Sequence, residues 1–270
     1  MGYMKNLYKY NKFLSAIAFF AVFAWLLGAD ATRATHSWAN YHWSRSGNPA
    51  TLQVGDNVSS VWDMHLNTAL SDWNASTAVQ LAKTPGLTSP KSCKPVAGRI
   101  EVCNSKYGRT GWLGIAQIWV SGDHIAQSIT KLNDTYFSTA KYNTPAWRQL
   151  VICQEVAHDF GLDHQDENFS NPNLGTCMDY TDNPSGPPSN EHPNTHDFEQ
   201  INAIYLHLDS ALSSLKTAIT GNTQGNDKSG FSEPSEWGKV IRRDSKGNPS
   251  LHERDLGNGQ KLITHVLWAE

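Results

Sequence analysis

The run that begins at Gln154 and ends at His164 constrains this chain most, because its polar residues recur at helical spacing. Gln154 and His158 are one helical turn apart and share a face, so both side chains can reach one metal ion. Glu155 lies beside them, and Gly161 permits the sharp turn that ends a helix. The chain then returns His164 to the same point. Three protein ligands leave one coordination position for water, which is the catalytic arrangement of zinc.

The residues around this run predict how it is presented. Thr144 and Pro145 are suited to the N-cap and the first position of a helix, so we predict a helix from Pro145 through His158 that ends at Gly161. Apolar residues at steps of three and four predict further helices over about 56–73 and 197–215. Strands are predicted over 41–43, 99–103, 113–120, 129–132 and 136–138, with an irregular segment over 83–94. This order predicts an α+β fold with a mixed sheet.

The C-terminal part differs in composition from what precedes it. Residues 216–232 are rich in Gly, Asn and Ser and predict a linker. Beyond it, the segments 237–243, 250–254 and 261–268 predict three short strands joined by tight turns. Residues 233–270 are therefore expected to form a small antiparallel β appendage of unknown role.

The N-terminus has the layout of a secretory signal peptide. Lysines at positions 5, 9 and 12 precede an apolar run over 13–27, and Ala29-Asp30-Ala31 fits a cleavage site. We assign residues 1–31 to this signal, with an uncleaved membrane anchor as the alternative. In both cases the remainder is expected to be secreted or extracellular, and membrane contact is expected only if the segment is uncleaved.

Composition and cysteines agree with an exported globular protein. Of the 270 residues, 39% are apolar and 17% charged, and a net charge of −3 gives no reason to expect a nucleic-acid partner. The even set Cys93, Cys103, Cys153 and Cys177 predicts two disulfides, for which three connectivities exist. A Cys93–Cys103 pair would be local, and Cys153–Cys177 would then tie the motif helix to a later loop. A zinc site made of cysteines is not supported, because no Cys-x-x-Cys pair is present.

The motif resembles that of the metzincin metallopeptidases, whose signature is His-Glu-x-x-His-x-x-Gly-x-x-His followed by a methionine turn. Glu155, His158, Gly161 and His164 match it position for position, and Met178 is the candidate for the turn. The resemblance covers residues 36–215 and is greatest to the matrixin-like bacterial branch. It implies a twisted mixed sheet, an active-site helix, a methionine turn and a C-terminal helix.

By the same resemblance, the chain would be a monomeric zinc endopeptidase that acts on peptide or protein substrates. Zinc would activate a water molecule, with Glu155 as the general base and His158 and His164 as ligands. Tyr180 follows Met178 by two residues. In the related astacin and serralysin branches a Tyr at this offset is an additional zinc ligand that can stabilise the oxyanion. A packed aromatic residue is the alternative for Tyr180.

The departure from the motif is at its first position, where Gln154 replaces His. Zinc prefers imidazole, thiolate and carboxylate to an amide. Three interpretations remain: Gln154 binds zinc through its oxygen, another residue takes its place, or the site is degenerate and the chain is a non-catalytic binding module. The candidates for replacement are Tyr180, Asp163, His192 and His196.

The remaining polar residues are assigned simpler roles. A lone histidine is more often structural or exposed than a ligand, so no metal role is predicted for His36, His42, His65, His124, His207, His252 or His265. The acidic cluster of Asp163, Asp166 and Glu167 predicts a solvated loop, with calcium binding as the second option.

Overall fold

The computed structural model describes residues 36–209, 231 and 233–269. The predicted signal, most of the predicted linker and residues 210–215 of the third predicted helix lie outside the described residues. Within the described residues, none of the helices is long and apolar enough to cross a membrane.

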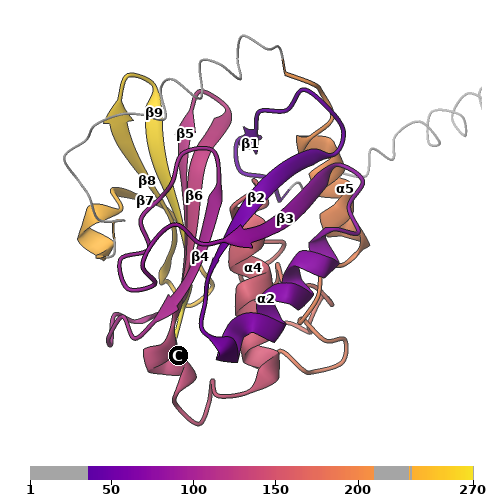
Figure 1. The fold of residues 1–270 in the computed structure, drawn as a ribbon. Helices are drawn as coiled ribbons and strands as arrows, with labels where there is room; N and C mark the ends of the chain where they lie inside the picture. Colours follow the sequence, from indigo (N-terminus) through magenta and orange to yellow (C-terminus); the bar gives the residue numbers. More distant parts are fainter. Residues whose placement is uncertain (1–35, 210–230, 232, 270) are drawn as a thin grey trace, which may run out of the picture. The chain divides into compact units, whose positions relative to one another are not determined.

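A mixed sheet organises the described residues (Figure 1). Its order is β3-β2-β4-β6-β5-β9-β8-β7, and β1 pairs with β6 off this path. The strands β3, β2, β4 and β6 are parallel to one another, whereas the pairs from β6–β5 to β8–β7 are antiparallel. The bounds are β1 His42–Trp43, β2 Ala50–Asn57, β3 Val79–Pro85, β4 Ile100–Ser105, β5 Trp112–Ser121, β6 His124–Asn133, β7 Lys239–Arg243, β8 Pro249–Gly257 and β9 Gln260–Trp268.

The helices α2 (Ser60–Trp73) and α4 (Pro145–His158) lie side by side against the sheet (Figure 1). The shorter helices are α3 (Asp134–Phe137), α5 (Thr195–Ile204) and a 3₁₀ turn, η1 (Pro234–Glu236). The predicted α+β organisation is therefore confirmed.

The helix α4 begins where the sequence predicts. The Thr144 side chain accepts a hydrogen bond from the Trp147 backbone N–H, and Pro145 occupies the first helical turn. Because α4 packs against both α2 and the sheet, nearly all of it is buried, including Gln154 and Glu155. Polar side chains in such a position need partners or a ligand.

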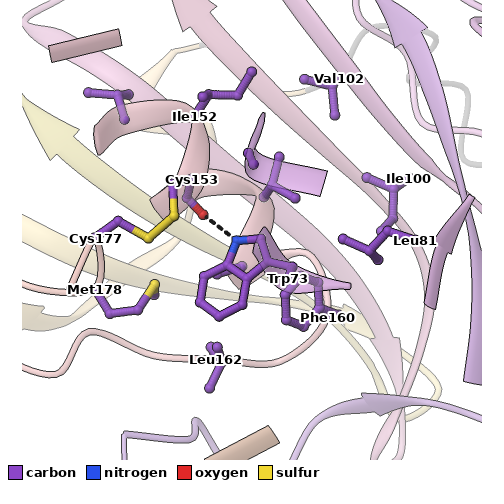
Figure 2. Close-up of a cluster of buried hydrophobic side chains, with 14 of the residues drawn as sticks. Trp73, Leu81, Ile100, Val102, Ile152, Cys153, Phe160, Leu162, Cys177 and Met178 are labelled. Carbon is purple, nitrogen blue, oxygen red and sulfur yellow. Dashed lines mark hydrogen bonds between the residues drawn. A yellow bond between two sulfur atoms is a disulfide. The ribbon is translucent and has the colours of Figure 1, made fainter. Parts of the chain in front are cut away.

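Figure 2 shows the packing around the motif end of α4. The Trp73 indole N–H donates to the Cys153 carbonyl at 3.1 Å, and Cys153 is disulfide-bonded to Cys177. The second disulfide is Cys93–Cys103. Of the three connectivities that the sequence left open, the structure has the one with a local first pair, so the motif helix is covalently tied to the loop that carries Met178.

Several predicted bounds were wrong. The helix expected from residue 56 begins at Ser60, because residues 55–57 continue β2 and pair with β4. The strand expected over 136–138 is instead α3, which Asn133 caps by accepting from the Thr135 backbone N–H. The segment expected to be irregular from residue 83 includes the end of β3, and β2 itself was not predicted. In each case a long-range backbone ladder or a cap outweighs local composition.

The three C-terminal strands are antiparallel, as expected, but they do not form a separate sheet. The strand β9 pairs with β5 along its whole length, from Trp112 opposite Trp268 to Ser121 opposite Gln260. The inward residues of β9, which include Ile263 and Leu267, belong to the same core as α4. The domain boundaries stay a prediction, whereas the pairing places β9 beside the motif helix.

Candidate metal centre

The end of α4 positions the motif residues as the spacing requires. His158 is the last residue of the helix, and the chain turns back at Gly161, whose φ is +103°. A side chain at this position would collide with the Tyr41 carbonyl oxygen. Glycine is needed for both reasons, and the turn returns His164 to the side of His158.

The Nε2 atoms of His158 and His164 lie 2.9 Å apart, and both side chains are buried. The other ring nitrogen of each is committed. His158 Nδ1 donates to the Leu162 carbonyl at 2.7 Å, and His164 Nδ1 donates to the Glu167 carboxylate at 2.5 Å. In neutral rings, both Nε2 atoms are therefore acceptors that face each other.

Two facing acceptors repel unless a proton or a cation lies between them. A proton on His158 is disfavoured, since burial and then the neighbouring His164 hold the pKa of His158 well below its ordinary value. A metal ion fits the arrangement, because metal-binding histidines commonly donate their second ring N–H to a carbonyl or carboxylate. Two nitrogens bound to one tetrahedral zinc at about 2.0 Å lie about 3.3 Å apart, close to the separation of this pair.

His265 joins this pair from β9. Its ring stacks on His158 with centroids 3.9 Å apart and planes 7° from parallel. One ligand atom from each of His158, His164 and His265 lies within 4.8 Å of the others. The His265 Nδ1 atom is buried and has no hydrogen-bond partner among the described residues. Three imidazoles therefore gather at one point, two from the motif and one from the C-terminal strand.

Gln154 is buried one turn before His158, as the spacing requires. Its side-chain NH₂ donates to the Cys177 carbonyl at 2.9 Å, and its oxygen has no hydrogen-bond partner among the described residues. The amide thus links α4 to the loop that precedes Met178. Metal binding through the Gln154 oxygen stays a prediction.

Glu155 faces β5 of the sheet. A Cβ atom on Gly114 of β5 would lie 2.7 Å from a Glu155 carboxylate oxygen, so the glycine makes room for the carboxylate. Burial, and then Asp159, raise the pKa of Glu155 well above its ordinary value. A carboxylate in this setting has a high affinity for a proton, which is the property that a general base uses.

Tyr180 and Met178 follow the motif histidines in the chain. The Tyr180 ring contacts the His164 ring edge-on with centroids 4.6 Å apart, and its hydroxyl donates to the Val266 carbonyl of β9 at 2.9 Å. Met178 is fully buried next to the Cys153–Cys177 disulfide (Figure 2). The catalytic role of Tyr180 and the turn role of Met178 stay predictions.

Two acidic residues near the site, Asp163 and Glu167, form ion pairs with an arginine of the protein. Arg242 of β7 forms a two-pronged ion pair with Asp163 and also contacts Glu167 at 2.8 Å. Ser250 of β8 donates to the second Glu167 oxygen at 2.7 Å. Since Glu167 in turn holds His164, the C-terminal strands support the motif. This use of the carboxylates gives no support to the calcium option.

The other proposed replacements for the first ligand lie elsewhere. His192 pairs with Asp72 at 2.7 Å, and the His196 ring stacks on His36 with centroids 4.8 Å apart. The sequence interpretation gave His265 no metal role. Its signal was the alternation in β9, where His265 takes an inward position between the apolar residues Ile263 and Leu267. A polar residue on the buried face of a strand indicates a special role.

Of the comparisons with known proteins, the one with solved structures gives a match. No protein-family model and no curated protein sequence matches the chain. Among solved structures, the chain is similar to high choriolytic enzyme 1, a hatching enzyme zinc-protease from Oryzias latipes (medaka fish). The identity is 12% and the TM-score 0.35, over 62% of this chain and 95% of that chain.

Proposed function

We propose that this chain is an exported zinc-dependent endopeptidase with His158, His164 and His265 as its metal ligands. The observation that carries the proposal is the pair of facing Nε2 acceptors on His158 and His164, each oriented by a hydrogen bond from Nδ1. His265 is the better third ligand by donor type, because an imidazole nitrogen binds zinc more strongly than the amide oxygen of Gln154. Its ring would turn out of the stack on His158 to bind, since two parallel rings cannot direct their in-plane lone pairs at one ion.

Each remaining residue has a role in peptide hydrolysis that its surroundings support. A bound zinc ion would supply Lewis-acid activation of water and of a peptide carbonyl. Glu155 would accept the proton of the attacking water, as its raised pKa favours. The Tyr180 hydroxyl already donates to a peptide carbonyl, that of Val266, and would donate in the same way to the carbonyl of a substrate.

The described state is closed to substrate. Glu155 is only 1% exposed, and β9 covers the edge of β5 beside it. An extended peptide can bind a free strand edge by adding to the sheet. Cleavage therefore requires the end of β9 beyond His265, where Leu267 pairs with Gly114, to leave this edge, so that a substrate strand can take its place while His265 stays on the metal.

The second candidate is a non-catalytic module that keeps zinc as a structural element. It is favoured by the same closure, because three histidines and a covered site leave no route for a peptide. The two candidates differ in what happens when β9 is loosened. An enzyme would become more active, whereas a structural module would lose zinc without gaining activity.

The test uses the full chain and compares the wild type with Glu155→Gln and Leu267→Pro. Leu267 lies near the end of β9, beyond His265 and opposite Gly114, so proline there removes a backbone donor and loosens this end of the strand. Zinc content is measured first, and then zinc-dependent cleavage of casein. We expect Leu267→Pro to cleave faster than the wild type and Glu155→Gln to bind zinc without cleaving.

The matched control is Glu253→Gln, which neutralises a carboxylate of β8 paired with Lys261 at 3.1 Å. It is expected to cleave as the wild type does. Cleavage that persists in Glu155→Gln would contradict the enzyme proposal. A wild type that binds zinc and a Leu267→Pro variant that has lost it, both without any cleavage, would favour the structural module.

A further inference from the structure

A second group of imidazoles gathers outside the motif, around Asp209. The ligand atoms of His42, His124 and Asp209 all lie within 4.8 Å of one another. His42 lies in β1 and His124 at the start of β6, directly opposite each other in the parallel pairing of these strands. Asp209 follows α5, so three distant parts of the chain meet at this point.

The orientation of His42 indicates a ligand. Its Nδ1 donates to the Asn40 carbonyl at 2.7 Å, which leaves Nε2 as an acceptor. The residue is 3% exposed, and this Nε2 atom has no hydrogen-bond partner among the described residues. It faces an Asp209 carboxylate oxygen at 3.5 Å, which is also an acceptor. A cation between the two atoms would satisfy both.

Asp209 is held in place by the backbone. Its N–H donates to the Arg45 carbonyl at 2.8 Å, and its Oδ2 accepts from the Arg45 N–H at 2.8 Å. This leaves Oδ1 to the histidines. His124 Nε2 lies 2.9 Å from Oδ1, and His207 Nε2 lies 3.5 Å from it. The carboxylate therefore presents one oxygen to three imidazoles.

His207 is the third imidazole near Asp209, and its side chain is largely exposed. It lies outside the three-residue group, but its ring contacts that of His42 edge-on with centroids 4.9 Å apart. Its side chain is 59% exposed, so it can adjust its position with little cost to packing. A small rotation would turn its Nε2 toward a shared ion.

We propose that His42, His124, His207 and Asp209 form a structural zinc site. Three imidazole nitrogens and one carboxylate oxygen make a complete tetrahedral set, with no open position for water or substrate. Zinc bound there would cross-link β1, the start of β6 and the segment after α5. The site does not depend on the proposed peptidase activity and shares no residue with it.

A simple ion pair is the competing interpretation, and the structure contains an example for comparison. His192 and Asp72 form a pair at 2.7 Å, with one imidazole on one carboxylate. Asp209 differs because three rings face it and only His124 is within hydrogen-bond distance of it. Hydrogen bonding alone accounts for His124 but leaves the buried His42 Nε2 without a partner.

The test measures zinc content and affinity of the full chain after dialysis against metal-free buffer. We expect His124→Ala to lose one zinc equivalent relative to the wild type. His207→Ala, whose exposed side chain is not needed for folding, should bind this zinc about tenfold more weakly or worse. The matched control His192→Ala should keep the wild-type content. Unchanged zinc content in His124→Ala, or unchanged affinity in His207→Ala, would overturn the four-ligand site.

Two further measurements separate this site from the motif. A His164→Ala chain should still bind one zinc equivalent and lose it when His124→Ala is added. Cobalt bound to the His164→Ala chain should give the intense visible absorption of a tetrahedral site, and adding Asp209→Asn should weaken it. If the His164→Ala chain binds no metal, the second site is wrong, while zinc binding of the wild type at the motif can still hold.

Discussion

The imidazole of His265 lies flat on that of His158, with ring centroids 3.9 Å apart and planes 7° from parallel. This contact joins the C-terminal strand β9 to the last residue of α4. The candidate metal centre therefore combines a local motif with a residue supplied by a distant strand.

Replacement of His265 tests this combination. We expect His265→Ala to lower zinc affinity at the motif by about tenfold or more, since a ligand is lost. Zinc at 100 times its dissociation constant would stabilise the wild type by about 2.7 kcal/mol, so the variant should also gain less stability from added zinc. The control is His252→Ala, a buried histidine on β8 whose ring packs on Trp237 instead. If Gln154→Ala lowers the affinity and His265→Ala does not, the third ligand is Gln154.

The ion pair between Arg242 and Asp163 predicts a pH-dependent contribution to stability. Burial acts to raise the pKa of Asp163. Hydrogen bonds from Arg242, together with the electrostatic effect of the nearby His265, outweigh burial, so the net pKa is lowered. A lowered carboxyl pKa contributes stability above the unfolded value of about 3.9, and this is lost as the pH falls toward the folded value.

Arg242→Met should therefore destabilise the metal-free protein by about 3 kcal/mol at neutral pH, because it leaves Asp163 buried and unpaired. The difference from the wild type should shrink as the pH falls below about 4. Denaturant unfolding at several pH values measures both. Arg243→Met, on the same strand, removes only a contact with the Gly247 carbonyl and should change little. A difference that is constant with pH would contradict the assigned pKa shift.

The turn at Gly161 predicts a large effect for a small substitution. Gly161→Ala places a methyl group against the Tyr41 carbonyl oxygen and requires a positive φ. We expect a loss of about 3 kcal/mol or more in the free energy of unfolding. Gly247→Ala is the matched control, because its φ is also positive, at +86°, but nothing lies within 4 Å of the added methyl. It should cost about 1 kcal/mol. Equal losses would show that collision at Gly161 is not the cause.

The Cys153–Cys177 disulfide is expected to support the metal centre as well as the fold. It spans 24 residues, and its two cysteines directly precede Gln154 and Met178. Replacing both cysteines by alanine should cost about 3 kcal/mol through the freed unfolded chain and should also weaken zinc binding. The control removes Cys93–Cys103, which spans 10 residues and packs in a separate cluster with Ile129. That variant should lose stability but keep its zinc affinity, and equal loss of affinity in both would contradict the specific role.

The sequence alone determined the local part of this protein. Thr144 and Pro145 start α4, Gly161 ends the turn after it, and the spacing of His158 and His164 brings their rings together. These features depend on residues close in the chain, whose relative positions follow from helical periodicity and backbone sterics. The motif can therefore be predicted from the sequence. The strands β2 and β3 cannot, because their pairing depends on residues distant in the chain.

Only the tertiary structure decided which other residues reach the two histidine groups. His265 meets His158 because β9 pairs with β5 in a particular register, and a slip of one residue would turn its side chain to the opposite face. His42 and His124 meet because β1 is parallel to β6 at that pair. Each strand by itself is compatible with several registers, so these contacts are set by packing of the whole sheet against α4 and not by any short stretch of sequence.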